Sequence, residues 1–228
     1  MRSLPYIDIH THSTRYEQET VTVQNLFPGD GFAPFSGRNF YSVGLHPWHI
    51  TTEAENNEAL QLVEEALEFD HVIFVGEAGL DKLIDKDFAE QQRVFRAQAF
   101  IAEEFQYPLL IHCVKAYNEV FELRKNMQPS MPWIFHGYSG GLHLTEQFLK
   151  LGFMFSFGHQ LFNGKARVIE SFKTLPLNKI FFETDEIEED VSVIYRQAAL
   201  LKGISEYELK EAVWKNFNRV ERTLIDRI

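Results

Sequence analysis

The stretch Leu4-Pro5-Tyr6-Ile7-Asp8-Ile9-His10-Thr11-His12 is an apolar run that ends in polar side chains. Side chains alternate between the two faces of a β-strand, so Asp8, His10 and His12 share one face and the two isoleucines share the other. Two imidazoles two residues apart at the end of a strand can bind one metal ion, with Asp8 behind them. Two surface histidines would produce the same bare pattern, so the rest of the sequence has to decide.

Short apolar runs rich in Val, Ile and Phe recur along the chain, and longer amphipathic segments separate them. The runs that we expect to form strands are Leu4–His10, Tyr41–Leu45, Val72–Gly76, Leu109–His112, Trp133–Phe135, Phe153–Phe157 and Ile180–Thr184. The segments that we expect to form helices are Thr52–Phe69, Asp87–Phe105, Lys115–Met127, Leu142–Leu151, Lys165–Thr174, Val191–Lys202 and Ser205–Leu224. Strands without polar alternation are buried on both faces, as in a parallel sheet. The repeated strand–helix order predicts an α/β fold, a TIM-like (β/α) barrel with residues 1–228 as a single domain.

The region Ser13–Asn39 departs from this repeat. It should carry a helix and a second strand, and Val21–Phe27 has the pattern of a strand. However, Ser13–Thr20 is shorter than the roughly dozen residues of a usual parallel crossover. A loop after the strand is indicated by Pro28, Gly29, Gly31, Pro34 and Gly37. We therefore expect an irregular or incomplete first βα unit.

The composition limits the classes of function. The 228 residues include 22 Lys+Arg and 33 Asp+Glu, a formal net charge of −11, so the chain lacks a broad cationic surface for capturing duplex nucleic acid. A local site with bound cations can still hold a phosphate. The single cysteine, Cys113, excludes an intrachain disulfide. The absence of a signal-peptide pattern and of an apolar run of about 20 residues predicts a cytoplasmic protein without a membrane segment; no obligate protein partner is indicated.

Four more expected strands end in side chains that can bind metals. Glu77 and His136 directly follow an apolar run, and His112 is the last residue of one. Glu183 and Asp185 stand at the end of the last run. In a barrel, the carboxyl ends of the strands converge on the mouth, where active sites lie. Together with the first two histidines, these side chains suit a pair of divalent ions such as zinc or manganese. Five separate strands that end in this way make the metal hypothesis much stronger than the first pattern alone.

The motifs occur in a fixed order along the chain. They are Asp8–His12, Tyr41–Pro47, Gly76–Asp81, Pro108–His112, Phe135–Gly140 and Glu183–Asp185, followed by Lys202–Ser205 and a helix with Asn216 near its end. In this order they resemble the TatD family of metal-dependent hydrolases and DNases. The resemblance runs from Tyr6 to about Val220 and is weakest over residues 13–39.

The resemblance implies a TIM-like barrel with two divalent ions, which would be Zn²⁺, Mn²⁺ or Mg²⁺. The implied metal ligands are His10, His12, Glu77, His112, His136 and Asp185. Glu77 would bridge the ions, the His-x-His pair and Asp185 would bind the first, and the other two histidines would bind the second. The implied reaction is phosphodiester hydrolysis in DNA or short single-stranded nucleic acid. Asp185 would be catalytic, orienting the attacking water or accepting its proton.

The sequence departs from the family pattern in its substrate walls. The family usually has Arg and Asp two and three residues after the histidine that corresponds to His112, whereas this chain has Val114 and Lys115. A cationic phosphate contact is thus lost or moved to Lys115. The family's Glu-Thr-Asp usually leads into a long loop with basic residues, but here the short run Glu186–Asp190 is acidic. The first βα unit is also shortened.

Three functions therefore stay open. The first is a TatD-like deoxyribonuclease, and the second is an amidohydrolase-type hydrolase of a non-nucleic-acid ester, amide or phosphomonoester. The third is a non-catalytic metal-binding partner protein, against which the complete set of ligand types argues. Further candidates for contacting the substrate or supporting a metal ligand are Asp8, His46, Asp81, Lys115, His159 and Glu183.

Overall fold

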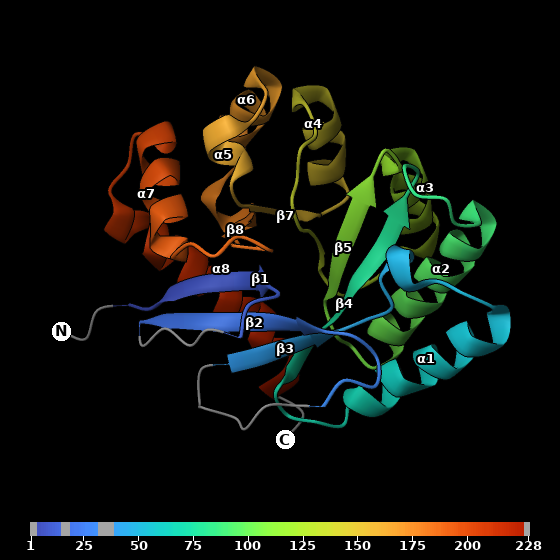
Figure 1. The fold of residues 1–228 in the computed structure, drawn as a ribbon. Helices are drawn as coiled ribbons and strands as arrows, with labels where there is room; N and C mark the ends of the chain where they lie inside the picture. The colour runs from blue at the N-terminus through green and yellow to red at the C-terminus, as the bar shows by residue number, and fades with distance from the viewer. Residues whose placement is uncertain (1–3, 15–18, 32–38, 226–228) are drawn as a thin grey trace.

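A computed structural model describes residues 4–14, 19–31 and 39–225, with side chains up to residue 220. Eight parallel strands form one sheet in sequence order (Figure 1). The strands are β1 Tyr6–Thr11, β2 Thr20–Leu26, β3 Asn39–Val43, β4 Val72–Asp81, β5 Leu109–Val114, β6 Trp133–Phe135, β7 Met154–Phe157 and β8 Ile180–Phe182. The helices are α1 Glu53–Ala66, α2 Phe88–Glu104, α3 Tyr117–Met127, α4 Leu142–Lys150, α5 Gln160–Asn163, α6 Ala166–Thr174, α7 Val191–Lys202 and α8 Glu206–Ile225, with short 3₁₀ turns η1 Pro47–His49 and η2 Leu177–Lys179.

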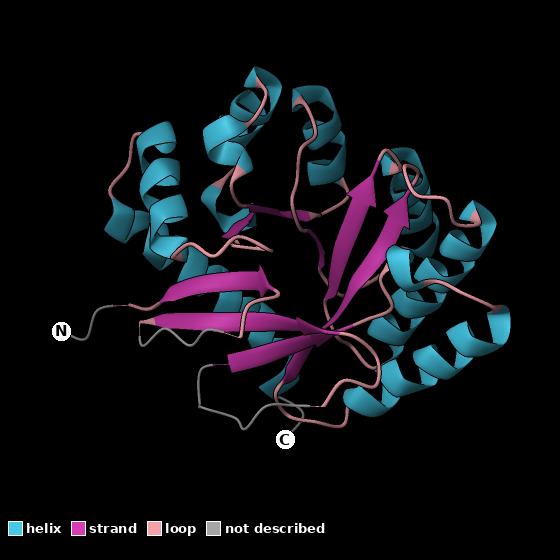
Figure 2. Cartoon of the chain, viewed as in Figure 1, coloured by secondary structure: helices cyan, strands magenta, loops and turns pink. Residues whose placement is uncertain are grey.

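The sheet curves into a nearly closed barrel, and helices surround it (Figure 2). The first and last strands meet just beyond β8, where Thr11 and Asp185 form a parallel bridge. The His12 backbone N–H donates to the Asp185 carbonyl at 3.0 Å, and the Asp185 N–H donates to the His10 carbonyl at 3.0 Å. The TIM-like barrel is confirmed, and its closing contact places Asp185 beside His10 and His12.

The expectation of an irregular first unit is also confirmed. Within the described residues, no helix separates β1, β2 and β3, and β2 falls on the predicted Val21–Phe27 strand. Eight residues between β1 and β2 can span roughly 26–29 Å, which is enough to return along a six-residue strand of about 20 Å without a helix. Of the expected loop markers, Pro34 and Gly37 lie outside the described residues, as does part of Ser13–Thr20.

The strand β4 differs from the sequence-based expectation, which ended it at Gly76. It continues to Asp81, and all ten of its residues are buried. The pairing of β4 with β5 changes register between Val75 and Ala78, so that Glu77 lies in the irregular step. Beyond the step, four more residues of β4 pair with β5 and bring Asp81 level with Val114. This extra pairing explains why the strand does not stop at the glycine.

The C-terminal helix α8 packs across the closing end of the barrel, against β1 and β8. The Asn216 side chain donates to the Leu177 carbonyl at 2.8 Å and to the Ile180 carbonyl at 2.9 Å. The Phe217 ring lies 5.9 Å from that of Phe40 in β3. Within the described part of the chain, none of the helices combines the length and the hydrophobicity that a membrane-spanning helix needs.

Gly79 in β4 should not tolerate a side chain. A Cβ atom there would lie 1.9 Å from the His112 carbonyl oxygen of β5, so alanine has to push the paired strands apart. Overpacking of this kind usually costs about 1–3 kcal/mol, and backbone cannot yield as a side chain can. We expect Gly79→Ala to lower the free energy of unfolding in urea by at least that amount. Gly31→Ala, which meets nothing within 4 Å, is the matched control, and equal stability of the two variants would contradict this prediction.

Candidate metal centre

All six ligands that the family resemblance implies lie at one end of the barrel. Each stands in the second half of a strand or within three residues of its end: His10 in β1, His12 after β1, Glu77 in β4, His112 in β5, His136 after β6 and Asp185 after β8. The carboxyl ends of parallel strands meet at the same rim, which is why residues distant in the sequence gather here.

The Glu77 carboxylate lies at the centre of this group and is 3% exposed. Its Oε2 atom is 3.3 Å from His10 Nε2 and 3.5 Å from His12 Nε2. Its Oε1 atom is 2.6 Å from His136 Nε2 and 2.8 Å from His112 Nδ1. The two oxygens of one carboxylate therefore face two different pairs of imidazoles.

Asp185 lies beside the pair formed by His10 and His12. Its Oδ1 atom lies 3.5 Å from His10 Nε2 and 3.7 Å from His12 Nε2, and its side chain is 41% exposed. The residue has a φ of 57°, a left-handed conformation that aspartate adopts more readily than most residues. The closing bridge of the barrel holds this backbone, so the carboxylate points at the histidines while it remains open to solvent.

The charges in this group stabilise one another. Burial by itself would raise the pKa of Glu77, but the charges of His136 and His10 lower it well below its usual value. Burial by itself would lower the pKa of His10, but Glu77 raises it to about 9, and the same opposition raises the pKa of His136. The pKa of Asp185 is lowered by His10 and His136 against the effect of burial. The carboxylates are therefore ionised at neutral pH.

The donor atoms fit a divalent cation. His10 Nε2 faces the centre and is buried without a hydrogen-bond partner, because the carboxylate oxygens near it are too far away to accept a well-formed bond. Within the described part of the chain, three groups have ligand atoms within 4.8 Å of one another: His10, His12 and Glu77; His10, His136 and Asp185; and His46, Glu77 and His112. Imidazole nitrogens and carboxylate oxygens are the donors that zinc and manganese take.

His46 lies closer to this centre than the sequence indicated. Its Nε2 atom is 3.2 Å from Glu77 Oε1, and its Nδ1 atom accepts the Trp48 backbone N–H at 3.2 Å. Burial lowers the pKa of His46, which favours the neutral ring. A neutral ring whose Nδ1 accepts a hydrogen bond carries its proton on Nε2. His46 therefore faces Glu77 as a hydrogen-bond donor.

Three acidic candidates stand behind the ligands. Asp8 accepts the Thr184 hydroxyl at 2.7 Å and the Thr184 backbone N–H at 3.1 Å, so it holds the residue next to Asp185, and burial raises its pKa to about 7. Glu183 Oε1 accepts the Gly137 N–H at 2.5 Å and lies 3.6 Å from His136 Nδ1. Asp81 Oδ2 lies 3.6 Å from His112 Nε2.

Two other candidates do not join the group. Lys115 is exposed in a left-handed turn after β5, with a φ of 58°, where we expected a helix to begin. His159 contacts its own helix, with Nε2 2.8 Å from Asn163 Nδ2 and its ring stacked on Phe162. Neither residue lines the cavity above Glu77. Cys113 is also no candidate, because burial raises the pKa of its thiol to about 12.

A cavity of about 380 Å³ opens above the centre. Its described lining consists of His12, Phe27, His46, Trp48, His49, Glu77, His112, His136, Asp185 and Glu186. Phe27, Trp48 and His49 form an aromatic wall that we did not anticipate from the sequence; the Phe27 and His49 rings are 4.3 Å apart. The signal for Phe27 was its position at the end of the second strand, the same place that marks the other site residues.

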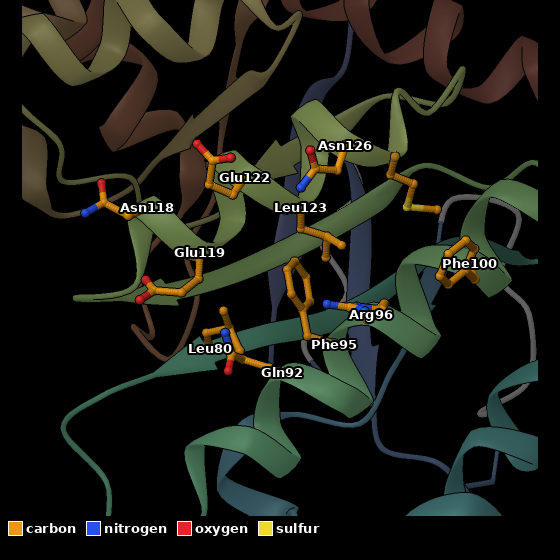
Figure 3. Close-up of a pocket in the computed structure, with 11 residues that line it drawn as sticks. Leu80, Gln92, Phe95, Arg96, Phe100, Asn118, Glu119, Glu122, Leu123 and Asn126 are labelled. Carbon is orange, nitrogen blue, oxygen red and sulfur yellow. The ribbon is translucent and has the colours of Figure 1, made fainter.

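A second cavity, of about 460 Å³, lies between α2 and α3 on the outside of the barrel (Figure 3). Phe95 and Arg96 of α2 and Leu123 of α3 are among its lining residues, and Leu80 of β4 contributes to its floor. None of the six implied ligands lines it. The chemistry described above therefore belongs to the smaller cavity at the mouth.

In this parallel barrel the strand ends gather imidazoles and carboxylates around one buried glutamate. This arrangement places the protein in the class of metal-dependent hydrolases. Comparison with known proteins specifies the family. The family model described as TatD related DNase matches residues 32–222, and the chain belongs to this family.

Individual relatives agree with this assignment. An uncharacterized metal-dependent hydrolase of Haemophilus influenzae is 30% identical over 177 residues, which cover 74% of this chain and 65% of that protein. A putative deoxyribonuclease TATDN1 homolog of Enterocytozoon bieneusi is 30% identical over 152 residues, covering 62% and 53%. The chain thus spans less than two thirds of these two relatives. The crystal structure of YjjV, a TatD homolog of Escherichia coli, superposes with a TM-score of 0.81 at 20% identity, covering 94% of this chain and 97% of that one, and confirms the fold.

Proposed function

We propose that residues 1–228 form one barrel domain that hydrolyses phosphodiester bonds of DNA or short single-stranded nucleic acid with two divalent metal ions. The observation that carries the proposal is the Glu77 carboxylate, whose two oxygens face different pairs of imidazoles. The Enterocytozoon relative is named as a putative deoxyribonuclease, which supports the choice of substrate.

The ligands divide into two sets around Glu77. His10, His12 and Asp185 would hold one ion, and His112 and His136 would hold the other. Paired divalent ions supply Lewis-acid stabilisation of phosphoryl oxygens and lower the pKa of water.

The chain's own residues supply positioning and proton transfer. Asp185 is ionised, partly exposed and directed into the cavity, so it can orient an attacking water or accept its proton. His46 carries its proton on Nε2 and can donate to an oxygen of the substrate or to Glu77. Phe27 and His49 offer flat faces on which a base can stack.

A second function is favoured by the charge of the cavity. Among its described lining residues there is no lysine or arginine, and Glu186 stands at the rim. An acidic rim repels a polyanionic backbone, so a compact ester, amide or phosphomonoester would enter more easily. The discriminating experiment compares single-stranded DNA, RNA and a chromogenic ester panel, each with added Zn²⁺, Mn²⁺ or Mg²⁺.

Introducing at position 114 the arginine that the family usually has there should separate the two functions. Val114 is half-buried at the end of β5, two residues beyond His112. If a nucleic-acid backbone occupies the cavity, Val114→Arg should raise phosphodiester cleavage by about tenfold, the scale of a contact of about 1.4 kcal/mol. Val114→Met fills similar space without charge and should have no such effect. A good ester hydrolase whose phosphodiester cleavage is unchanged in Val114→Arg would favour the second function.

Metal binding should become tighter as the pH rises. In the metal-free protein the pKa of His10 is about 9, because Glu77 favours its protonated form against the effect of burial. A metal ion has to displace that proton, so binding releases protons and weakens in acid. We expect the apparent affinity for Zn²⁺ to rise between about pH 6 and about pH 9, as measured by competition with a chromophoric chelator. An affinity that is independent of pH over this range would exclude His10 as a ligand.

A further inference from the structure

Trp48 combines an exposed ring with a hydrogen bond to a buried group. It lies in η1, two residues after His46, and is 53% exposed at the rim of the cavity. Its indole Nε1–H donates to Asp81 Oδ2 at 2.9 Å, although Asp81 is 3% exposed. A wall residue that served only to cover the cavity would not need this contact.

Asp81 is held on both sides of its carboxylate. Oδ1 accepts the Leu83 backbone N–H at 2.8 Å, while Oδ2 accepts the indole of Trp48. The Asp81 backbone N–H donates to Gln91 Oε1 at 2.8 Å, which fixes the strand end beneath the carboxylate. Asp81 therefore has one carboxylate orientation that satisfies all its partners.

This orientation places a negative charge at the outer edge of His112. Asp81 Oδ2 is 3.6 Å from His112 Nε2, a buried atom without a hydrogen-bond partner, while His112 Nδ1 lies 2.8 Å from Glu77 Oε1. A neutral imidazole that offers the Nδ1 lone pair to a cation keeps its proton on Nε2. That proton would then face Asp81, and a carboxylate in this place fixes the ring orientation of a ligating imidazole.

We propose that Trp48 is a positioning residue that acts through Asp81: its indole N–H holds the carboxylate against Nε2 of His112, so that Nδ1 is presented on the side of Glu77. The inference rests on the proposed metal function. It adds two residues that act on a ligand without contacting the ion, and it assigns the ligating nitrogen of His112.

The test measures binding of Zn²⁺ alone to the metal-stripped chain of residues 1–228 by competition with a chromophoric chelator. Trp48→Phe keeps an aromatic ring and the backbone N–H to His46 but removes the indole donor. Asp81→Asn keeps the shape but removes the charge. We expect Trp48→Phe to weaken binding about tenfold and Asp81→Asn to weaken it by about 10–100-fold, the usual scale for such partners. The double variant should bind no more weakly than Asp81→Asn alone, because Trp48 acts through Asp81.

Trp214→Phe is the matched control. Trp214 belongs to α8, stacks on Phe217 and lies outside the cavity, so its replacement should leave Zn²⁺ affinity unchanged. An independent readout is the indole N–H of Trp48 in NMR spectra, which should exchange with solvent faster in Asp81→Asn than in the wild type. This exchange reports the hydrogen bond itself and not the overall stability of the fold.

The possible failures are distinguishable. Wild-type protein that does not bind Zn²⁺ at the centre would overturn the proposed metal function and this inference together. Wild-type protein that binds Zn²⁺, with Trp48→Phe binding equally well, would overturn this inference alone. Multiplicative losses in the double variant would show that Trp48 and Asp81 act independently and would also overturn it.

Discussion

Replacing Glu77 by glutamine should abolish binding of the two proposed metal ions and nearly all of the proposed hydrolysis. Glutamine has the same shape, but it has no charge and only one oxygen. It therefore cannot place a carboxylate oxygen in front of each of the two pairs of imidazoles. The loss should exceed the roughly 10–100-fold that removal of a residue behind a ligand costs. In the metal-free variant the pKa of His10 and His136 should fall, because the Glu77 charge is what raises it.

Elemental analysis of the purified variant measures the metal content, and turnover under saturating metal measures activity. Glu211→Gln is a suitable control, because Glu211 lies in α8 and pairs with Lys215 at the surface, 2.8 Å away. This control should retain both metal and activity. A Glu77→Gln protein that still carries two ions per chain would refute the proposed role of Glu77 in binding both ions.

Replacing Asp185 by asparagine should reduce turnover by roughly 10²–10⁴-fold, the usual contribution of a general base. The pKa of Asp185 is lowered, so the carboxylate is ready to take a proton at neutral pH, whereas an amide cannot take one. Asparagine also tolerates the left-handed φ of 57° at this position, which alanine would not. The closing bridge of the barrel uses the backbone of residue 185, so the variant should fold.

Single-turnover rates with metal in excess separate a lost proton acceptor from a lost ligand. If Asp185 mainly takes the proton, excess metal should not restore the rate, and the melting temperature should stay close to that of the wild type. If excess metal restores full turnover, Asp185 is a ligand only. Full activity of Asp185→Asn without added metal would show that Asp185 is not a catalytic residue.

Much of the candidate site could be predicted because its residues occupy equivalent positions. His10 and His12 follow the period of two along a strand, and Glu77, His112 and His136 end apolar runs. Parallel strands bring their carboxyl ends to one rim whatever the details of packing. The convergence of these residues is therefore a consequence of local pattern and topology, and the structure brings all six expected ligands together.

Other parts of the site depend on backbone that has no local signature. Lys115 and His159 also follow strands, yet one lies in an exposed left-handed turn and the other contacts its own short helix. Trp48 contacts Asp81 across 33 positions in the sequence. Neither the turn nor the pairing can be inferred from composition, because each depends on how loops from different units approach one another.

The alternation of strands and helices, the shortened first unit and the residue types at the rim could all be predicted from the amino-acid sequence, since hydrophobic period and chain length act locally. The three-dimensional arrangement was needed to show which imidazole nitrogen meets which carboxylate oxygen, that His46 faces Glu77, and that Asp185 is held by the closing bridge between β1 and β8. These relations depend on strand register and side-chain orientation, which have no local signature. The step between Val75 and Ala78 shows this, because a change in strand pairing there places the Glu77 carboxylate among the histidines.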